Sequence, residues 1–86
     1  MNYIASIAER LAAALPGCPE DLIRLYALLV RVKGADTTDE DVHDAWSAWQ
    51  MVSDPAHRSL IPFDELTPEV QALDTKYAQA IRAVAA

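Results

Sequence analysis

The sequence predicts an all-α fold, a small single-domain bundle of four or five helices. Apolar residues recur at the spacing of three and four residues that is typical of amphipathic helices. Capping residues, prolines and glycines separate these runs from one another. With 86 residues, the chain has the size of one domain, so residues 1–86 are expected to fold as a unit.

The first predicted helix begins after Asn2, whose side chain can cap it. The segment Pro16-Gly17-Cys18-Pro19 ends it, because two prolines and a glycine interrupt a helix. The helix carries one apolar stripe, which consists of Ile4, Ile7, Ala8, Leu11 and Leu15. Together with the next helix it is expected to form an N-terminal helical hairpin over residues 1–34.

The second predicted helix covers residues 20–33 and ends at Gly34, a residue suited to a left-handed terminator. Glu20 and Asp21 stand in its first turn, where negative charge is favourable. Its apolar residues occupy nearly every side: Leu22, Ile23, Leu25, Tyr26, Leu28, Leu29, Val30 and Val32. This pattern is typical of a helix with neighbours on several faces, so we expect it at the centre of the core.

The third predicted helix starts near residue 38 or 39 and stops before Pro55. Two overlapping capping boxes mark its start, Thr37 with Glu40 or Thr38 with Asp41. The apolar stripe of this helix contains both tryptophans and consists of Val42, Ala45, Trp46, Trp49 and Val52.

No regular helix is expected from residue 54 to residue 63. Leu60–Phe63 is predicted to be an extended strap across the helix that carries Trp46, because Pro62 biases Ile61 towards extended backbone. A short turn over residues 64–66 follows, and Thr67-Pro68-Glu69 begins another helix.

The last helix carries one apolar face, made by Val70, Leu73, Tyr77, Ile81 and Val84. It either runs without interruption or breaks at Asp74, in which case Asp74 caps a final segment from about Thr75 to Ala85. The break is the expectation adopted here.

Composition and charge limit the partners and the location that we expect for this protein. A net charge of −6 argues against duplex nucleic acid as a partner, because phosphate contacts need a basic surface. Cys18 is the only cysteine, so no intramolecular disulfide forms and a cytoplasmic location is expected. No stretch is long and apolar enough for a membrane span. The 52% apolar content favours self-association, for example as a homodimer.

The candidate functional residues allow two interpretations each. Trp46 and Trp49 share a helix face and either fill the core or form a stacking platform for a planar ligand. His57 and Arg58 either lie in a solvated loop or donate hydrogen bonds to a phosphate. His43, at the border of the apolar stripe, is expected to hydrogen-bond a backbone or carboxylate group.

The sequence contains no recognisable catalytic or metal-binding motif. His43 and His57 are fourteen residues apart and lack the close pairing of zinc ligands. Ser59 lies near His57, but no orienting third group accompanies the two. We therefore expect no metal, no cofactor and no enzymatic activity.

Residues 42–86 resemble a compact ryanodine-receptor repeat (RyR) domain. His43-Asp44-Ala45-Trp46-Ser47 is similar to that family's His-x-x-Trp-Ala helix, and the run from His57 to Leu66 is similar to its His-Pro-x-Leu-Val-Pro-Tyr-x-x-Leu strap. Asp74 falls where the family has an aspartate before its last helix. The whole chain also resembles short proteins of actinobacterial phages, which implies a phage origin.

The resemblance implies a non-enzymatic phage protein that binds and sequesters a nucleotide-derived molecule, a host immune signal, in the cytoplasm of the infected cell. The expected contacts are base stacking by Trp46 and Trp49 and phosphate binding by Arg58 and His57. Polar orientation of the ligand falls to His43 with Asp64 or Asp74, and Phe63 is a further expected ligand-binding residue. The alternative is a protein-interaction module whose apolar helical face docks on a host or phage protein.

Overall fold

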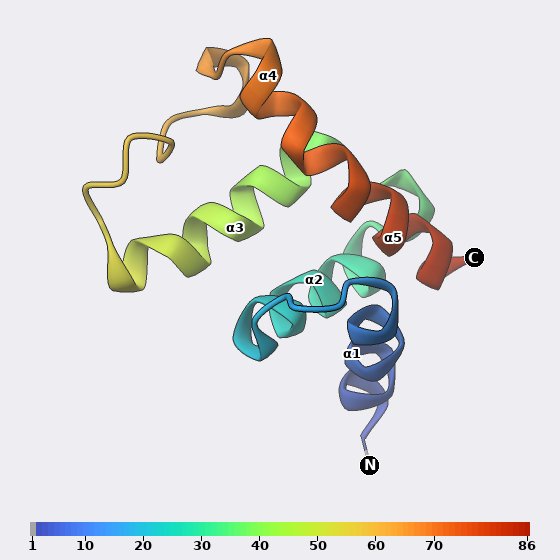
Figure 1. Cartoon of the computed structure of the whole chain (residues 1–86). Helices are drawn as coiled ribbons and strands as arrows, with labels where there is room; N and C mark the ends of the chain where they lie inside the picture. The colour runs from blue at the N-terminus through green and yellow to red at the C-terminus, as the bar shows by residue number, and fades with distance from the viewer. Residues whose placement is uncertain (1) are drawn as a thin grey trace.

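Helix α2 (Glu20–Val32) lies at the centre of the fold, in contact with α1, α3 and α5 (Figure 1). The computed structural model describes residues 2–86 and confirms the all-α prediction, since these residues include no strand. The longer helices are α1 (Tyr3–Ala14), α2, α3 (Asp39–Ser53) and α5 (Thr75–Ala85). The four-residue α4 (Pro68–Gln71) and three short 3-10 helices, Gly34–Asp36, Phe63–Glu65 and Ala72–Asp74, join them.

The core forms where α1, α2, α3 and α5 meet. Its most deeply buried residues come from all four helices: Leu11, Tyr26, Ala27, Val42, Ala78 and Ile81. The central position predicted for the second helix is therefore confirmed. One of its faces lacks a neighbour, however, since Leu28 and Val32 are 51% and 64% exposed. These two residues lie one turn apart on α2 and form an exposed apolar strip.

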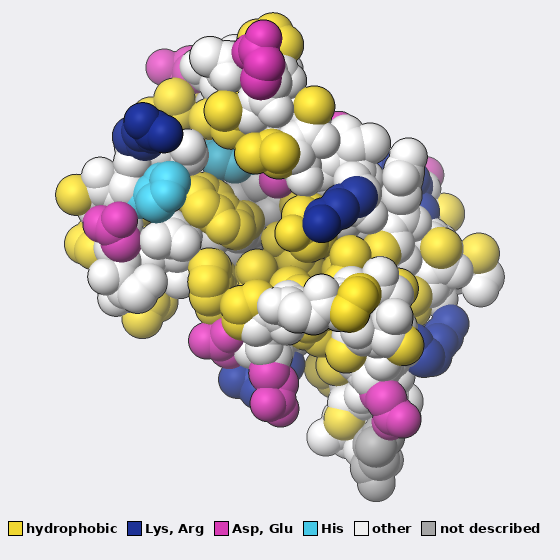
Figure 2. All heavy atoms as spheres, viewed as in Figure 1, with side chains coloured by type: hydrophobic (Ala, Val, Ile, Leu, Met, Phe, Trp, Pro, Cys, Tyr) yellow, Lys and Arg dark blue, Asp and Glu magenta, His cyan; other side chains and the backbone are white. Residues whose placement is uncertain are grey.

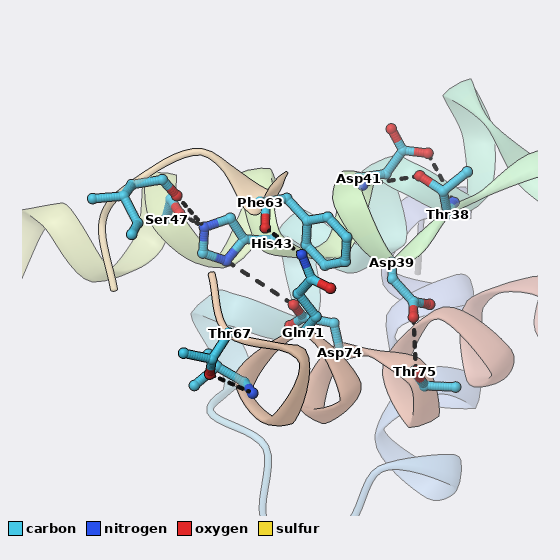
Figure 3. A network of polar contacts seen from close by, with 12 residues as sticks. Thr38, Asp39, Asp41, His43, Ser47, Phe63, Thr67, Gln71, Asp74 and Thr75 are labelled. Carbon is cyan, nitrogen blue, oxygen red and sulfur yellow. Dashed lines mark hydrogen bonds and ion pairs between the residues drawn. The ribbon is translucent and has the colours of Figure 1, made fainter. Parts of the chain in front are cut away.

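Local signals at the helix starts are present as predicted. The side chain of Asn2 accepts a hydrogen bond of 2.7 Å from the backbone N–H of Ala5. At α3, Thr38 and Asp41 form the reciprocal capping box, with hydrogen bonds of 2.9 and 3.1 Å (Figure 3). Gly34 has a φ of +58°, so it supplies the left-handed residue that follows α2.

The predicted strap crosses α3. Pro62 has extended backbone angles, φ −54° and ψ 146°. The carbonyl oxygen of Ile61 accepts a hydrogen bond of 2.7 Å from His43 Nε2 on α3. At the far end of the strap, the side-chain amide of Gln71 donates a 2.9 Å hydrogen bond to the carbonyl oxygen of Phe63. These contacts join the strap to α3 and α4, and the turn predicted after it is the 3-10 helix Phe63–Glu65.

The capping role predicted for Asp74 is wrong. Asp74 has helical angles, φ −81° and ψ −16°, and its side chain makes no capping hydrogen bond. The predicted break itself is present: the 3-10 helix Ala72–Asp74 separates α4 from α5, and α5 has the predicted bounds Thr75–Ala85. Asp74 does not cap α5 because of a contact with a distant part of the chain: its carboxylate faces His43 of α3 and not the N–H groups of its own helix.

Candidate functional site

A cavity of about 790 Å³ opens between the α1–α2 loop, α2, α3, the loop after α3 and the segment from α4 to α5. We call it the aromatic cavity, because its walls include Tyr26, Trp46, Trp49 and Tyr77. Figure 2 shows a hollow in this face of the molecule whose walls are mostly hydrophobic, with histidine and acidic atoms visible inside it. Such a volume lies within the range of small-molecule sites, roughly 300–1,000 Å³.

The two tryptophans lie between the core and the cavity. Trp46 and Trp49 are partly buried against the core, and both also line the cavity. Two imidazole rings contact Trp46: His43 stacks at 5.7 Å between ring centroids, and His57 lies edge-on at 5.2 Å. These contacts restrict the movement of the Trp46 ring.

The structure brings only some of the predicted site residues together. Five of the eight line the aromatic cavity: His43, Trp46, Trp49, His57 and Asp74. Arg58 and Asp64 are exposed and do not line it. Phe63 does not line it either, and packs near His43 with 6.1 Å between ring centroids.

His57 belongs to the loop after α3, where the backbone N–H of Ser59 donates a 3.0 Å hydrogen bond to His57 Nδ1. In the neutral imidazole, the hydrogen is then on Nε2. The Nε2–H group of His57 can therefore donate to a ligand. Arg58, the next residue, is exposed and does not line the cavity.

His43 is buried at 3% exposure, and its tautomer follows from its partner. Nε2 lies 2.7 Å from the carbonyl oxygen of Ile61, which can only accept, so Nε2 carries a hydrogen. This confirms the prediction that His43 hydrogen-bonds a backbone group. The other ring nitrogen, Nδ1, lies 4.0 Å from Asp74 Oδ2, too far for a hydrogen bond (Figure 3).

Asp74 is the most unusual polar group of the cavity. Its Oδ2 atom is buried and has no hydrogen-bond partner among the described residues. Burial raises the pKa of Asp74 to about 6; the charge of His43 opposes the rise and that of Asp39 adds to it. A buried carboxylate without a donor is costly, so this group needs an explanation.

Ser47, His43 and Asp74 are arranged in the order of a catalytic triad, but the hydrogen positions do not suit one. Ser47 Oγ lies 3.4 Å from His43 Nε2, the atom whose hydrogen is committed to Ile61. Nε2 therefore has no lone pair with which to take a proton from Ser47, and Ser47 does not line the cavity.

Cys18 lines the cavity from the α1–α2 loop. Burial raises the pKa of its thiol; nearby Lys76 opposes the rise and Asp21 adds to it. A thiol with a raised pKa is protonated at neutral pH and is a weak nucleophile. Cys18 therefore lacks the low thiol pKa that is typical of a nucleophilic cysteine.

Tyr26, Lys76 and Tyr77 are among the cavity residues that sequence reasoning missed. The two tyrosine rings lie 5.7 Å apart, and Lys76 Nζ lies 5.0 Å from the centre of the Tyr77 ring. Burial raises the pKa of Tyr26, and Cys18, Tyr77 and Asp74 add to the rise, so these groups share one region. One signal in the sequence could have found the two tyrosines. A buried tyrosine hydroxyl needs a hydrogen-bond partner, so tyrosine side chains favour positions at the border of a core.

Within residues 2–86, no three histidine, cysteine or acidic side chains cluster in a way that could hold a metal ion. None of the helices described has the length and apolar character needed to cross a bilayer.

The fold and the cavity define a small all-α domain with an aromatic-walled cavity. The chain belongs to the family described as a domain of unknown function, DUF7701, whose model matches residues 2–86. No curated protein and no solved structure matches it. The family match extends over the N-terminal hairpin as well as the C-terminal half, and it supports neither the RyR resemblance nor a phage origin.

Proposed function

We propose that this domain binds a nucleotide-type small molecule in the aromatic cavity and holds it without changing it chemically. The observation that carries the proposal is the cavity itself, about 790 Å³ with two tryptophans and two tyrosines in its walls. A flat ring gains roughly 1–3 kcal/mol from stacking on one aromatic side chain. The contacts of Trp46 with the imidazole rings of His43 and His57 restrict the indole before binding, which reduces the entropic cost of that stacking.

The phosphate contact that we propose differs from the one expected from the sequence. Arg58 does not line the cavity, whereas Lys76 does and is exposed to solvent. Lys76 is thus a candidate to meet a phosphate at the open side of the cavity, with the remaining N–H of His57 as a second donor.

A pair of variants tests this assignment. Lys76→Gln is expected to reduce the preference for adenosine 5′-monophosphate over adenosine about 3- to 10-fold, because one exposed charge–phosphate contact is lost. Arg58→Gln is the matched control, and its preference should equal that of the wild-type protein. Isothermal titration calorimetry measures both affinities.

The result that rejects the phosphate assignment is a loss of preference in Arg58→Gln and not in Lys76→Gln. The proposed function itself fails if the wild-type protein gives no heat with a panel of linear and cyclic nucleotides and nucleosides.

The biological role that we propose is sequestration of a nucleotide-derived host immune signal in the cytoplasm of an infected cell. It rests on the resemblance of residues 42–86 to the RyR domain and of the chain to phage proteins. The protonated state of Cys18 and the blocked Nε2 of His43 are consistent with action by occupancy alone. Nucleotide that is held in a closed complex is no longer available to a host receptor.

A second candidate is a protein-interaction module. The observation in its favour is the exposed strip of Leu28 and Val32 on α2, beside which Arg31 lies 5.4 Å from the centre of the exposed Tyr3 ring. The homodimer that the apolar content predicts also requires an exposed apolar surface of this kind. Pull-down of a stoichiometric partner from host lysate, with flat nucleotide titrations, is the outcome that favours this candidate.

A further inference from the structure

We propose that Asp74 selects ligands whose flat ring carries an N–H donor edge, such as the amino group of a nucleobase. The inference rests on the proposed function and names the part of the ligand that enters the cavity first. It starts from the one buried polar atom among the described residues that lacks a hydrogen-bond partner, Asp74 Oδ2.

No group among the described residues donates a hydrogen bond to Asp74 Oδ2. His43 faces it, with Nδ1 at 4.0 Å from Oδ2. Because Nε2 donates to Ile61, the Nδ1 of a neutral His43 carries a lone pair and no hydrogen. Thr75, the next residue in the chain, donates its hydroxyl hydrogen to Asp39 at 2.7 Å. Neither of these two neighbours therefore donates to Asp74.

A ligand can reach part of this carboxyl group. The Asp74 side chain is 14% exposed and lines the cavity. Oδ2 is buried, so the exposed fraction belongs to the rest of the side chain, which includes Oδ1. A ligand N–H at this position gains a charge-assisted hydrogen bond. A ligand acceptor or anion at the same position meets like charge and loses its hydration.

The position of Asp74 also orients the ligand. Asp74 is the last residue of the 3-10 helix Ala72–Asp74 and Lys76 lies in the first turn of α5, and residues two positions apart in a helix point in different directions. Both line the cavity, with Lys76 the more exposed. The amino edge of the ring therefore lies at Asp74, the ring lies against the tryptophans, and a phosphate extends towards Lys76.

Two matched ligand pairs test the inference by calorimetry. Adenosine and purine riboside differ only in an exocyclic amino group, as do guanosine and inosine. We expect the wild-type protein to bind at least one amino member about 10-fold or more tighter than its partner, because a hydrogen bond to a charged group is lost. Asp74→Asn should reduce this ratio to about 3-fold or less. Asp64→Asn, an exposed residue outside the cavity, should leave it unchanged.

Two results overturn the inference and leave the proposed function standing: equal affinities within both pairs, or an unchanged ratio in Asp74→Asn. A far-ultraviolet circular dichroism spectrum equal to that of the wild-type protein shows that each variant has folded. If none of the four nucleosides binds and the nucleotide panel is also flat, the proposed function fails and this inference fails with it.

Discussion

Replacement of Trp46 by alanine is expected to weaken nucleotide binding about 10- to 100-fold, which corresponds to the loss of one aromatic stacking surface. The ring lies in the cavity wall and contacts the imidazole rings of His43 and His57. Loss of the indole ring removes the stacking surface. It also removes the contact that keeps His57 in the cavity wall. The helical circular dichroism spectrum should persist, because Trp46 is only partly buried and the most buried core residues do not include it.

Trp46→Phe is the matched control, since it keeps an aromatic face at the same place. Its affinity should fall no more than about 5-fold. Unchanged affinity in Trp46→Ala contradicts a stacking role. A collapsed spectrum for Trp46→Ala, with Trp46→Phe folded and binding like the wild-type protein, indicates that Trp46 serves mainly in the core.

Asp74→Asn is expected to raise the free energy of unfolding at pH 8 by about 1–2 kcal/mol. Burial raises the pKa of Asp74 from 3.8 to about 6, so the folded protein binds this proton more tightly than the unfolded chain. The stability that the proton confers is complete below the unfolded pKa and is lost as the pH rises through about 6. Two pKa units correspond to about 3 kcal/mol, and solvent contact in the cavity reduces this value.

The asparagine carries no charge at any pH, so the variant avoids the cost of burying an ionised carboxylate. Urea unfolding at pH 4.5, 6 and 8 measures the effect, and the gain should shrink towards pH 4.5. Asp64→Asn, at an exposed position, is the control and should show little change. A variant that is less stable than the wild-type protein at pH 8 indicates that a protonated His43 satisfies the carboxylate.

Much of the fold was predictable because its signals are local. The caps at Asn2, Thr38 and Thr67 each act within three residues of their own helix start. The strap followed from one proline, Pro62, which restricts the backbone on both sides of it. In these segments, neighbouring residues alone determine the conformation, so one sequence was sufficient.

The error at Asp74 came from a competing long-range contact. An aspartate before a helical segment is a good cap by local rules, but here its carboxylate faces His43, 31 positions earlier in the chain. The 3-10 helix that connects α4 and α5 lies against α3, and this packing holds the backbone of Asp74 in helical angles. No periodic pattern in the sequence reports such a contact.

The candidate site was predictable only on its α3 side. His43, Trp46 and Trp49 share a helix face, which the spacing of the residues reveals directly. The opposite walls come from the α1–α2 loop and from Lys76 and Tyr77, which only tertiary packing brings together. Arg58 was assigned to the site because it adjoins His57, but consecutive loop residues point in different directions and Arg58 is exposed.

The central claim is that the aromatic cavity is the ligand site, and nuclear magnetic resonance tests it most directly. Trp46 and Trp49 are the only two tryptophans, so the indole N–H region of a nitrogen-15 spectrum holds two signals, both from the cavity wall. On addition of adenosine 5′-monophosphate, both indole signals should shift together with the backbone amides of Asp74 and Lys76. Indole signals that stay in place contradict the claim, most clearly if the amides of Leu28 and Val32 shift in their stead.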